Sequence, residues 1–309
     1  MLDYRQLQAL ASVIEAQSFD KAARRLHLTQ SAVSQRVKQL EESLGQLLII
    51  RSQPLRPTDA GQQLLRHYRQ ISLLQSELLE SLGDAKAEGF TKLAIGLNAD
   101  SLATWFLDAI DPLMQQSPIL LELRIDDQDQ THHFLRQGKV IGCISASDQP
   151  MQGTNCTPLG ITRYRALASA EFIARYFTDT RTGHTGQHHD IDPQRFLQAP
   201  SIEFNQKDEL QDRYLATVFG IEGDYPRHRV PSPHGFLDFM LRGYGWGMVP
   251  DQQSQSLIDQ GLLYEISPGN SLSVPLYWHS WNLTTELSRR LSESLVRYCR
   301  QQLEPIPDS

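Results

Sequence analysis

Side chains that can read DNA gather in one short segment near the N-terminus. Gln30, Ser31, Ser34 and Gln35 follow Thr29, a residue type that often begins a helix. A glutamine amide can form two hydrogen bonds with adenine, and a serine hydroxyl can bond a base edge or a phosphate. Nearby basic side chains are better suited to phosphates, which position a protein without specifying sequence. These are Arg36, Lys38, Arg51 and Arg56. The alternative interpretation is a solvated polar face on a small helical bundle.

A second group of polar side chains follows the predicted strands of the C-terminal part. Asn98, Asp100 and Ser101 come directly after the predicted strand 92–97, where they open a helix and suit a ligand carboxylate. Helix capping explains the same residues equally well. Asp126 and Asp127 follow the next strand and can hold a cation through charge-assisted hydrogen bonds, unless they form a solvated acidic loop. The remaining predicted binding residues lie at strand ends or helix starts and are Ser145, Phe204 and His234.

The N-terminal segment has the spacing of three helices and a hairpin. Apolar residues recur at helical intervals over 4–16 and 19–26, and a third helix runs from the Thr29 cap to Gly45. Its predicted buried stripe is Val33, Val37, Leu40 and Leu44. A strand, a proline-containing turn and a returning strand follow. The sequence therefore predicts a winged helix-turn-helix DNA-binding domain over 1–58, whose third helix enters the major groove.

Residues 59–90 are predicted to form a linker helix and a hinge. Apolar and polar side chains along this helix step alternately by four and three residues, which is the spacing of a heptad seam. They are Leu64, Tyr68, Ile71, Gln75, Leu78 and Leu82. One interpretation is a helix pair with a second protomer, in which Gln75 fixes the register; the other is a long helix packed on its own domain. A dimer would supply two recognition helices for an inverted-repeat operator.

The remaining residues, 91–309, alternate predicted strands and helices with short connections. This pattern predicts an α/β effector-binding domain with a parallel, doubly wound sheet. We expect two lobes, with lobe one formed by 91–162 and 268–309 and lobe two by 163–267. Because open α/β sheets bind ligands at the carboxyl ends of their strands, the cleft between the lobes is the predicted ligand site.

Charge and composition limit the classes of function. The 309-residue chain has a net charge of −7, yet residues 1–58 hold eight Lys/Arg against five Asp/Glu, so basic charge is concentrated at the N-terminus. The three cysteines are widely spaced, which is typical of a reducing compartment. Neither a membrane span nor a signal peptide is recognisable, so we expect a cytoplasmic protein with no membrane partner. Nucleophile-elbow, phosphate-loop, zinc-protease and dinucleotide motifs do not occur, so we expect neither an enzyme nor a cofactor.

The run FDKAARRLHLTQSAVSQRVKQLEESLGQLLIIR, followed by RPTDAG, resembles the signature of LysR-type transcriptional regulators. The resemblance is strong over 3–90. It implies double-stranded DNA as a partner, antiparallel pairing of the linker helix in a homodimer or homotetramer, and a periplasmic-binding-protein-like sensor domain. We further predict binding to a dyad operator upstream of target promoters and contact with RNA polymerase.

Segments of the C-terminal part are similar to one LysR subfamily, that of ArgP (IciA) and LysG. The segments are NADSLATW, SPILLELRIDD, RQGKVIG and PLYWH. That subfamily senses lysine and arginine and commonly controls basic-amino-acid export. By resemblance, Asn98, Asp100 and Ser101 would hold the α-carboxylate and α-amino ends of the effector, and Asp126 its side-chain cation. Two alternatives remain open: a regulator of an organic or aromatic acid, and a replication-origin or architectural DNA-binding protein.

Residues 179–192 look like an insertion relative to that subfamily. His184 and His188 lie four residues apart, with His189 adjacent, a spacing that can serve a metal ion on a helix. Glycines at 183 and 186 disfavour a helix, so we predict a surface loop and no metal site.

Overall fold

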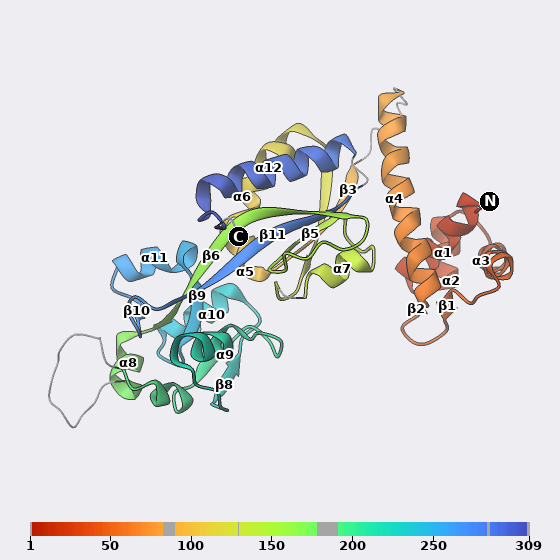
Figure 1. Ribbon diagram of the computed structural model, residues 1–309. Coiled ribbons are helices and arrows are strands. Elements are labelled where there is room, and N and C mark those ends of the chain that lie inside the picture. The colour runs from red at the N-terminus through yellow and green to blue at the C-terminus, as the bar shows by residue number, and fades with distance from the viewer. Residues whose placement is uncertain (1, 83–89, 129, 178–190, 283–284, 308–309) are drawn as a thin grey trace.

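A computed structural model describes residues 2–82, 90–128, 130–177, 191–282 and 285–307. Helices near the N-terminus form one unit, and a strand-rich C-terminal part follows it (Figure 1). None of the helices within these ranges combines the length and the apolar character needed to span a membrane.

The N-terminal unit consists of the predicted helices and a two-stranded wing. Its elements are α1 (Tyr4–Ala16), α2 (Phe19–Arg25), α3 (Gln30–Leu44), β1 (Ile49–Ile50), β2 (Arg56–Pro57) and α4 (Asp59–Ser81). Ser18 and Thr29 cap α2 and α3 by accepting hydrogen bonds from the backbone N–H of Lys21 and Ala32. These caps satisfy donors that a helix start leaves unpaired. The predicted helices and wing are confirmed.

Small and branched apolar residues fill the core between these helices. Val33, Val37 and Leu40 are buried as predicted, with exposed fractions of 3% or less. Leu44 is 39% exposed, so its predicted burial is wrong. It lies in the last turn of α3, directly before Gly45 takes a left-handed conformation (φ 66°) and leads the chain away from the core.

Helix α4 has two different environments along its length. Leu64 and Tyr68 pack against the core of the N-terminal unit, and the rings of Tyr68 and Tyr4 lie 5.2 Å apart. Leu78 and Leu82, near the other end, are 57% and 71% exposed. Two of the six residues of the predicted heptad seam therefore pack within their own chain, and pairing with a second protomer stays a prediction for the exposed end of the helix.

The C-terminal part is built around a mixed seven-stranded sheet with the order β10-β6-β11-β5-β3-β4, in which β9 also pairs with β6. Its strands are β3 (Thr91–Leu97), β4 (Ile119–Ile125), β5 (Gly142–Ser145), β6 (Thr154–Ala168), β9 (Gly247–Pro250), β10 (Tyr264–Glu265) and β11 (Ser271–Trp281). A separate parallel pair is formed by β7 (Ser201–Glu203) and β8 (Arg227–Arg229).

The expectation of a wholly parallel sheet is wrong. Strand β3 pairs in parallel with β4 and β5, but the long strands β6 and β11 are antiparallel to each other. These two strands run through the whole C-terminal part (Figure 1). One carries the chain out of the first group of strands and the other brings it back, so they must run in opposite directions. The predicted lobe boundary at 162/163 consequently falls inside β6.

Helices cover both sides of this sheet. The helices of the C-terminal part are α5 (Ala99–Thr104), α6 (Phe106–Gln116), α7 (His132–Arg136), α8 (Ala170–Tyr176), α9 (Leu210–Tyr214), α10 (Pro233–Leu241), α11 (Asp251–Asp259) and α12 (Glu286–Gln302), with a short 3-10 helix η2 (Pro193–Leu197) and a short π-helix η3 (Leu215–Phe219). Helix α12 lies against α6, and the sheet buries Trp278 and Tyr164 beneath its helices.

The two parts of the chain touch through α4. Arg69 donates a hydrogen bond of 2.7 Å to the carbonyl oxygen of Gly138, which follows α7, and its guanidinium also lies 3.7 Å from Glu15 in α1. The guanidinium of Arg66 lies 5.3 Å from the ring centre of Trp281. One face of α4 thus contacts the N-terminal unit and another contacts the C-terminal part.

Candidate DNA-binding face and effector cavity

The polar face of α3 points into solvent. The predicted base-reading side chains of Gln30, Ser31 and Gln35 are exposed, and that of Ser34 is partly exposed. Because Val33 and Val37 lie on the opposite side and anchor the helix to the core, packing does not restrict the residue types on the outer face. This arrangement leaves the first turns of α3 free to enter a groove.

Basic side chains flank this face. Lys38 lies one turn beyond Ser34 and forms an exposed ion pair of 3.5 Å with Glu42, while Arg36 is partly exposed. Arg51 and Arg56 are exposed on the wing, and the guanidinium of Arg51 lies 5.8 Å from the ring centre of Phe19. Cations on both sides of a polar helix suit two phosphate backbones bordering one groove.

A cavity that is open to solvent lies in the C-terminal part where several strand ends meet. It is lined by the segments after β4 and β7 and by residues at or near the starts of α5, α9, α10 and α11 and in β9. The lining residues are Asn98, Ala99, Asp100, Asp126, Asp127, Gln128, Phe204, Asp208, Leu210, Pro233, Phe236, Met248, Val249, Pro250 and Gln253.

One wall of the cavity carries uncharged polar groups. Asn98 and Gln128 are 3% and 2% exposed, and Nδ2 of Asn98 donates to Oε1 of Gln128 at 3.2 Å. Within the described residues, Nε2 of Gln128, Oδ1 of Asn98 and the nearby buried Oγ of Ser101 have no hydrogen-bond partner. A buried polar group without a partner costs about 1–3 kcal/mol. Since Gln128 Nε2 can donate into the cavity, this wall suits a ligand carboxylate.

Four aspartates also line the cavity, and we call this group the acidic wall. They are Asp100, Asp126, Asp127 and Asp208. Burial raises the pKa of Asp100 to about 6, although Oδ2 of Asp100 accepts a 2.8 Å hydrogen bond from the Tyr164 hydroxyl. Burial also raises the pKa of Asp208, against the hydrogen bonds that its oxygens accept from the backbone N–H groups of Phe204 and Leu210. A cationic ligand would offset the cost of ionising these carboxyl groups.

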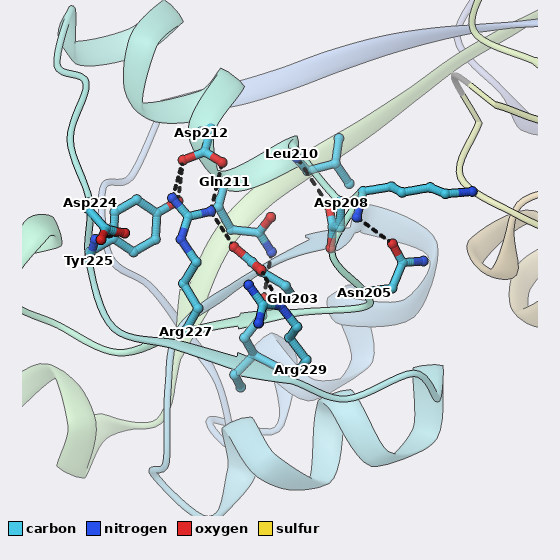
Figure 2. A network of polar contacts seen from close by, with 12 residues as sticks. Glu203, Asn205, Asp208, Leu210, Gln211, Asp212, Asp224, Tyr225, Arg227 and Arg229 are labelled. Carbon is cyan, nitrogen blue, oxygen red and sulfur yellow. Dashed lines mark hydrogen bonds and ion pairs between the residues drawn. The ribbon is translucent and has the colours of Figure 1, made fainter.

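An ion-pair network around the buried Glu203 holds the loop that carries Asp208 (Figure 2). Glu203, the last residue of β7, is 2% exposed and pairs with Arg227 and, at 3.6 Å, with Arg229. Arg227 also binds both oxygens of Asp212 at 2.8 Å. The network ties β7, β8 and α9 together, and this fixes the start of the 204–209 loop at the cavity edge.

The chain is similar in sequence to known DNA-binding regulators. Residues 4–62 match the family described as bacterial regulatory helix-turn-helix protein, lysR family. The HTH-type transcriptional regulator ArgP of Aeromonas salmonicida is 40% identical over 305 residues, which cover 98% of this chain and 99% of that protein. The chain belongs to the LysR family of transcriptional regulators.

Two solved structures of LysR regulators extend the likeness to the whole fold. ArgP from Mycobacterium tuberculosis has a TM-score of 0.85 and 37% identity, covering 99% of this chain and all of that one. LysG from Corynebacterium glutamicum, solved at full length with bound effector Arg, has a TM-score of 0.77 and 32% identity, covering 98% of this chain and all of that one.

This LysR chain brings together most of the residues that the sequence suggested for the effector. Asn98, Asp100, Asp126, Asp127 and Phe204 all line the cavity. Ser101 and Ser145 are buried behind its wall, and the Ser145 hydroxyl donates at 3.0 Å to the carbonyl oxygen of Gln128. The structure does not bring His234 to the cavity: its side chain is 91% exposed and lies 3.9 Å from Asp238 on the outside of α10.

Sequence reasoning missed several cavity groups. Gln128 stands directly beside the two aspartates that were selected, but only its burial and unpaired amide mark it as a binding residue. Asp208 and Tyr164 come from a loop and from the middle of a long strand, where no local pattern signals a site. The histidine-rich segment lies almost wholly outside the described residues. Among those described, no three His, Cys, Asp or Glu side chains are grouped to hold a metal ion.

Proposed function

We propose that this LysR-family regulator senses a basic amino acid, arginine or lysine, in the cavity and couples its binding to operator DNA. The observation that carries the proposal is the pairing, in one cavity, of the acidic wall with the uncharged amide of Gln128, whose Nε2 has no hydrogen-bond partner among the described residues. A basic amino acid has two cations and one carboxylate, which match these two walls. The LysG structure solved with arginine supports the same ligand class.

The lining residues assign each group of the ligand to a partner. The α-carboxylate accepts a hydrogen bond from Gln128 Nε2, and the side-chain cation meets Asp126 and Asp127. The α-ammonium lies toward Asp100, whose carboxylate it stabilises in the charged form. An aromatic or organic acid is the weaker candidate, since it has no cation to offset the cost of ionising the buried aspartates of the acidic wall.

On the DNA side, we propose that α3 lies in the major groove with Gln30, Ser34 and Gln35 toward base edges. The basic side chains of α3 and the wing would contact phosphates. The exposed end of α4, which includes Leu78 and Leu82, would pair two protomers and so match a dyad operator. Control of an exporter gene and contact with RNA polymerase belong to the same proposal.

A continuous set of contacts supports coupling between the two sites. The loop that holds Asp126 to Gln128 leads directly into α7, and the carbonyl oxygens of Gln137 and Gly138 after α7 accept hydrogen bonds from Gln62 and Arg69 of α4. A ligand that shifts this loop would act on α4, provided that it binds the two arrangements with different affinity.

Calorimetric titration of the full-length protein tests the effector class. Arginine and lysine are expected to bind, and glutamate and benzoate are not. Binding of glutamate or benzoate, together with no binding of arginine or lysine, would contradict the proposal.

A further inference from the structure

An ion pair joins the segment after β7 to the segment after β4, at a residue that lines the cavity. Nζ of Lys207 lies 3.1 Å and 3.0 Å from the two carboxylate oxygens of Asp126. Asp126 follows β4 and its side chain is 14% exposed, whereas Lys207 follows β7 and its side chain is 55% exposed. A cation that belongs to the protein itself thus occupies the acidic wall where the effector's side-chain cation is expected.

The backbone under Lys207 is held firmly. Its N–H donates at 2.7 Å to Oδ1 of Asn205, and the Asp208 carboxylate accepts hydrogen bonds from Phe204 and Leu210 on either side (Figure 2). Only the flexible methylene chain therefore has to move for the ammonium group to leave Asp126. This geometry resembles a short tether, which keeps a weakly binding group at high local concentration.

The energy of the pair is small enough for a ligand to replace it. Because the Lys207 end of the pair is exposed, water screens much of its attraction to Asp126. An effector cation that reaches Asp126 brings further contacts at the uncharged wall, which Lys207 cannot make. A guanidinium also offers two parallel N–H donors to one carboxylate, where an ammonium offers a point charge.

We propose that Lys207 is a specificity-determining residue, a tethered competitor that the cationic end of the effector must displace from Asp126. The inference rests on the proposed function, because it concerns the same cavity and ligand class. Lys207 therefore lowers the affinity for ligands with a cationic side chain. Such a ligand binds only when its other contacts outweigh the loss of the ion pair between Lys207 and Asp126. Neutral analogues, which do not need Asp126, are insensitive to Lys207.

Substitution of Lys207 tests this directly in the full-length protein. Lys207→Gln should bind arginine and lysine about 2- to 5-fold more tightly, the range expected for loss of an exposed ion pair. Lys207→Arg should bind them more weakly, because it places a two-pronged competitor on Asp126. Citrulline, which is neutral where arginine is charged, should bind both variants and the wild type alike. Lys92→Gln, an exposed charge removal on β3, is the matched control and should change nothing.

The outcomes separate the inference from the proposed function. Unchanged or weaker arginine binding by Lys207→Gln, with normal binding by the wild type, overturns the inference alone; weaker binding would place Lys207 on the ligand carboxylate. If neither protein binds arginine or lysine, the proposed function fails and the inference falls with it. Binding by the variant where the wild type shows none supports the inference. A tightened affinity for citrulline in Lys207→Gln would also overturn it.

Discussion

The recognition face of α3 and the effector cavity differ in how the chain builds them. The α3 face uses residues within one continuous run, 29–38, whose side chains point into solvent. The cavity collects side chains from five separate stretches between 98 and 253, and several of them are buried. The comparison teaches that a surface site depends on the local helix, whereas a cavity depends on the sheet that assembles it.

The first prediction concerns the α3 face, where loss of function should come without loss of stability. Replacing Gln30, Ser34 and Gln35 together by alanine should weaken specific operator binding by about 2–6 kcal/mol, since each of two bidentate glutamine contacts contributes about 1–3 kcal/mol. Arginine binding and the urea midpoint should stay unchanged. Gln39→Ala, the same residue type on the same helix, is the control in electrophoretic or anisotropy titrations. Intact operator recognition by the folded triple variant would remove α3 from the interface.

The second prediction concerns the support of the cavity, where buried charge makes stability depend on a single partner. Arg227→Met should lower the free energy of unfolding by about 3 kcal/mol, because it leaves Glu203 buried with only the more distant Arg229. Arg229→Met, which removes a half-exposed side chain, should cost less than about 1 kcal/mol. Urea unfolding of the two variants gives the comparison, and equal losses would show that Glu203 does not depend on Arg227.

The third prediction separates ligand binding from folding in the cavity itself. Asp126→Asn should weaken arginine binding by about 10- to 100-fold, which corresponds to the loss of one charge-assisted hydrogen bond. DNA affinity in the absence of ligand should be preserved. Asp111→Asn, an exposed carboxylate on α6, is the control. Calorimetry that finds the same arginine affinity in Asp126→Asn and the wild type would move the cation site elsewhere in the cavity.

The fourth prediction uses the pKa of Asp100, which burial raises from 3.8 to about 6. The folded protein keeps this proton up to about pH 6 while the unfolded chain releases it near pH 4, so the contribution of Asp100 to stability falls as pH rises from 4 to 6. The free energy of unfolding of Asp100→Asn, relative to that of the wild type, should therefore rise by about 1–2 kcal/mol as the pH increases from about 4.5 to about 7.5. This amount is reduced for partial solvent exposure of the side chain. Urea unfolding at these two pH values measures this change. The same stability difference between variant and wild type at both pH values would contradict a raised pKa of Asp100.

The same comparison explains what the sequence could and could not predict. Helical spacing with caps at Ser18 and Thr29 is local information, and it predicted α1 to α4 and the wing. It failed at Leu44, whose exposure depends on where the chain goes after Gly45. Strand positions were also predicted, but the direction of β6 against β11 depends on the path of the whole chain between lobes.

In the cavity, too, the sequence predicted residues that local position marks and missed residues that depend on the fold. Asn98, Asp100 and Asp126 were found because they sit directly after strands, where an α/β sheet binds its ligands. His234 was selected by the same rule, yet α10 turns its side chain outward. Asp208 and Lys207 escaped notice because their role depends on β7 meeting the loop after β4, a contact between residues 81 positions apart.

Coupling between the cavity and the α3 face is the central claim, and one titration tests it most directly. The full-length protein is titrated onto an operator fragment, selected by that protein from random duplexes, with no ligand, with saturating arginine and with citrulline. Arginine should change the affinity for the operator or the length of the protected footprint. If arginine changes the operator affinity by some factor, operator DNA should change the arginine affinity by that same factor. Identical affinities and footprints with and without arginine, in a protein that binds arginine, would contradict the account.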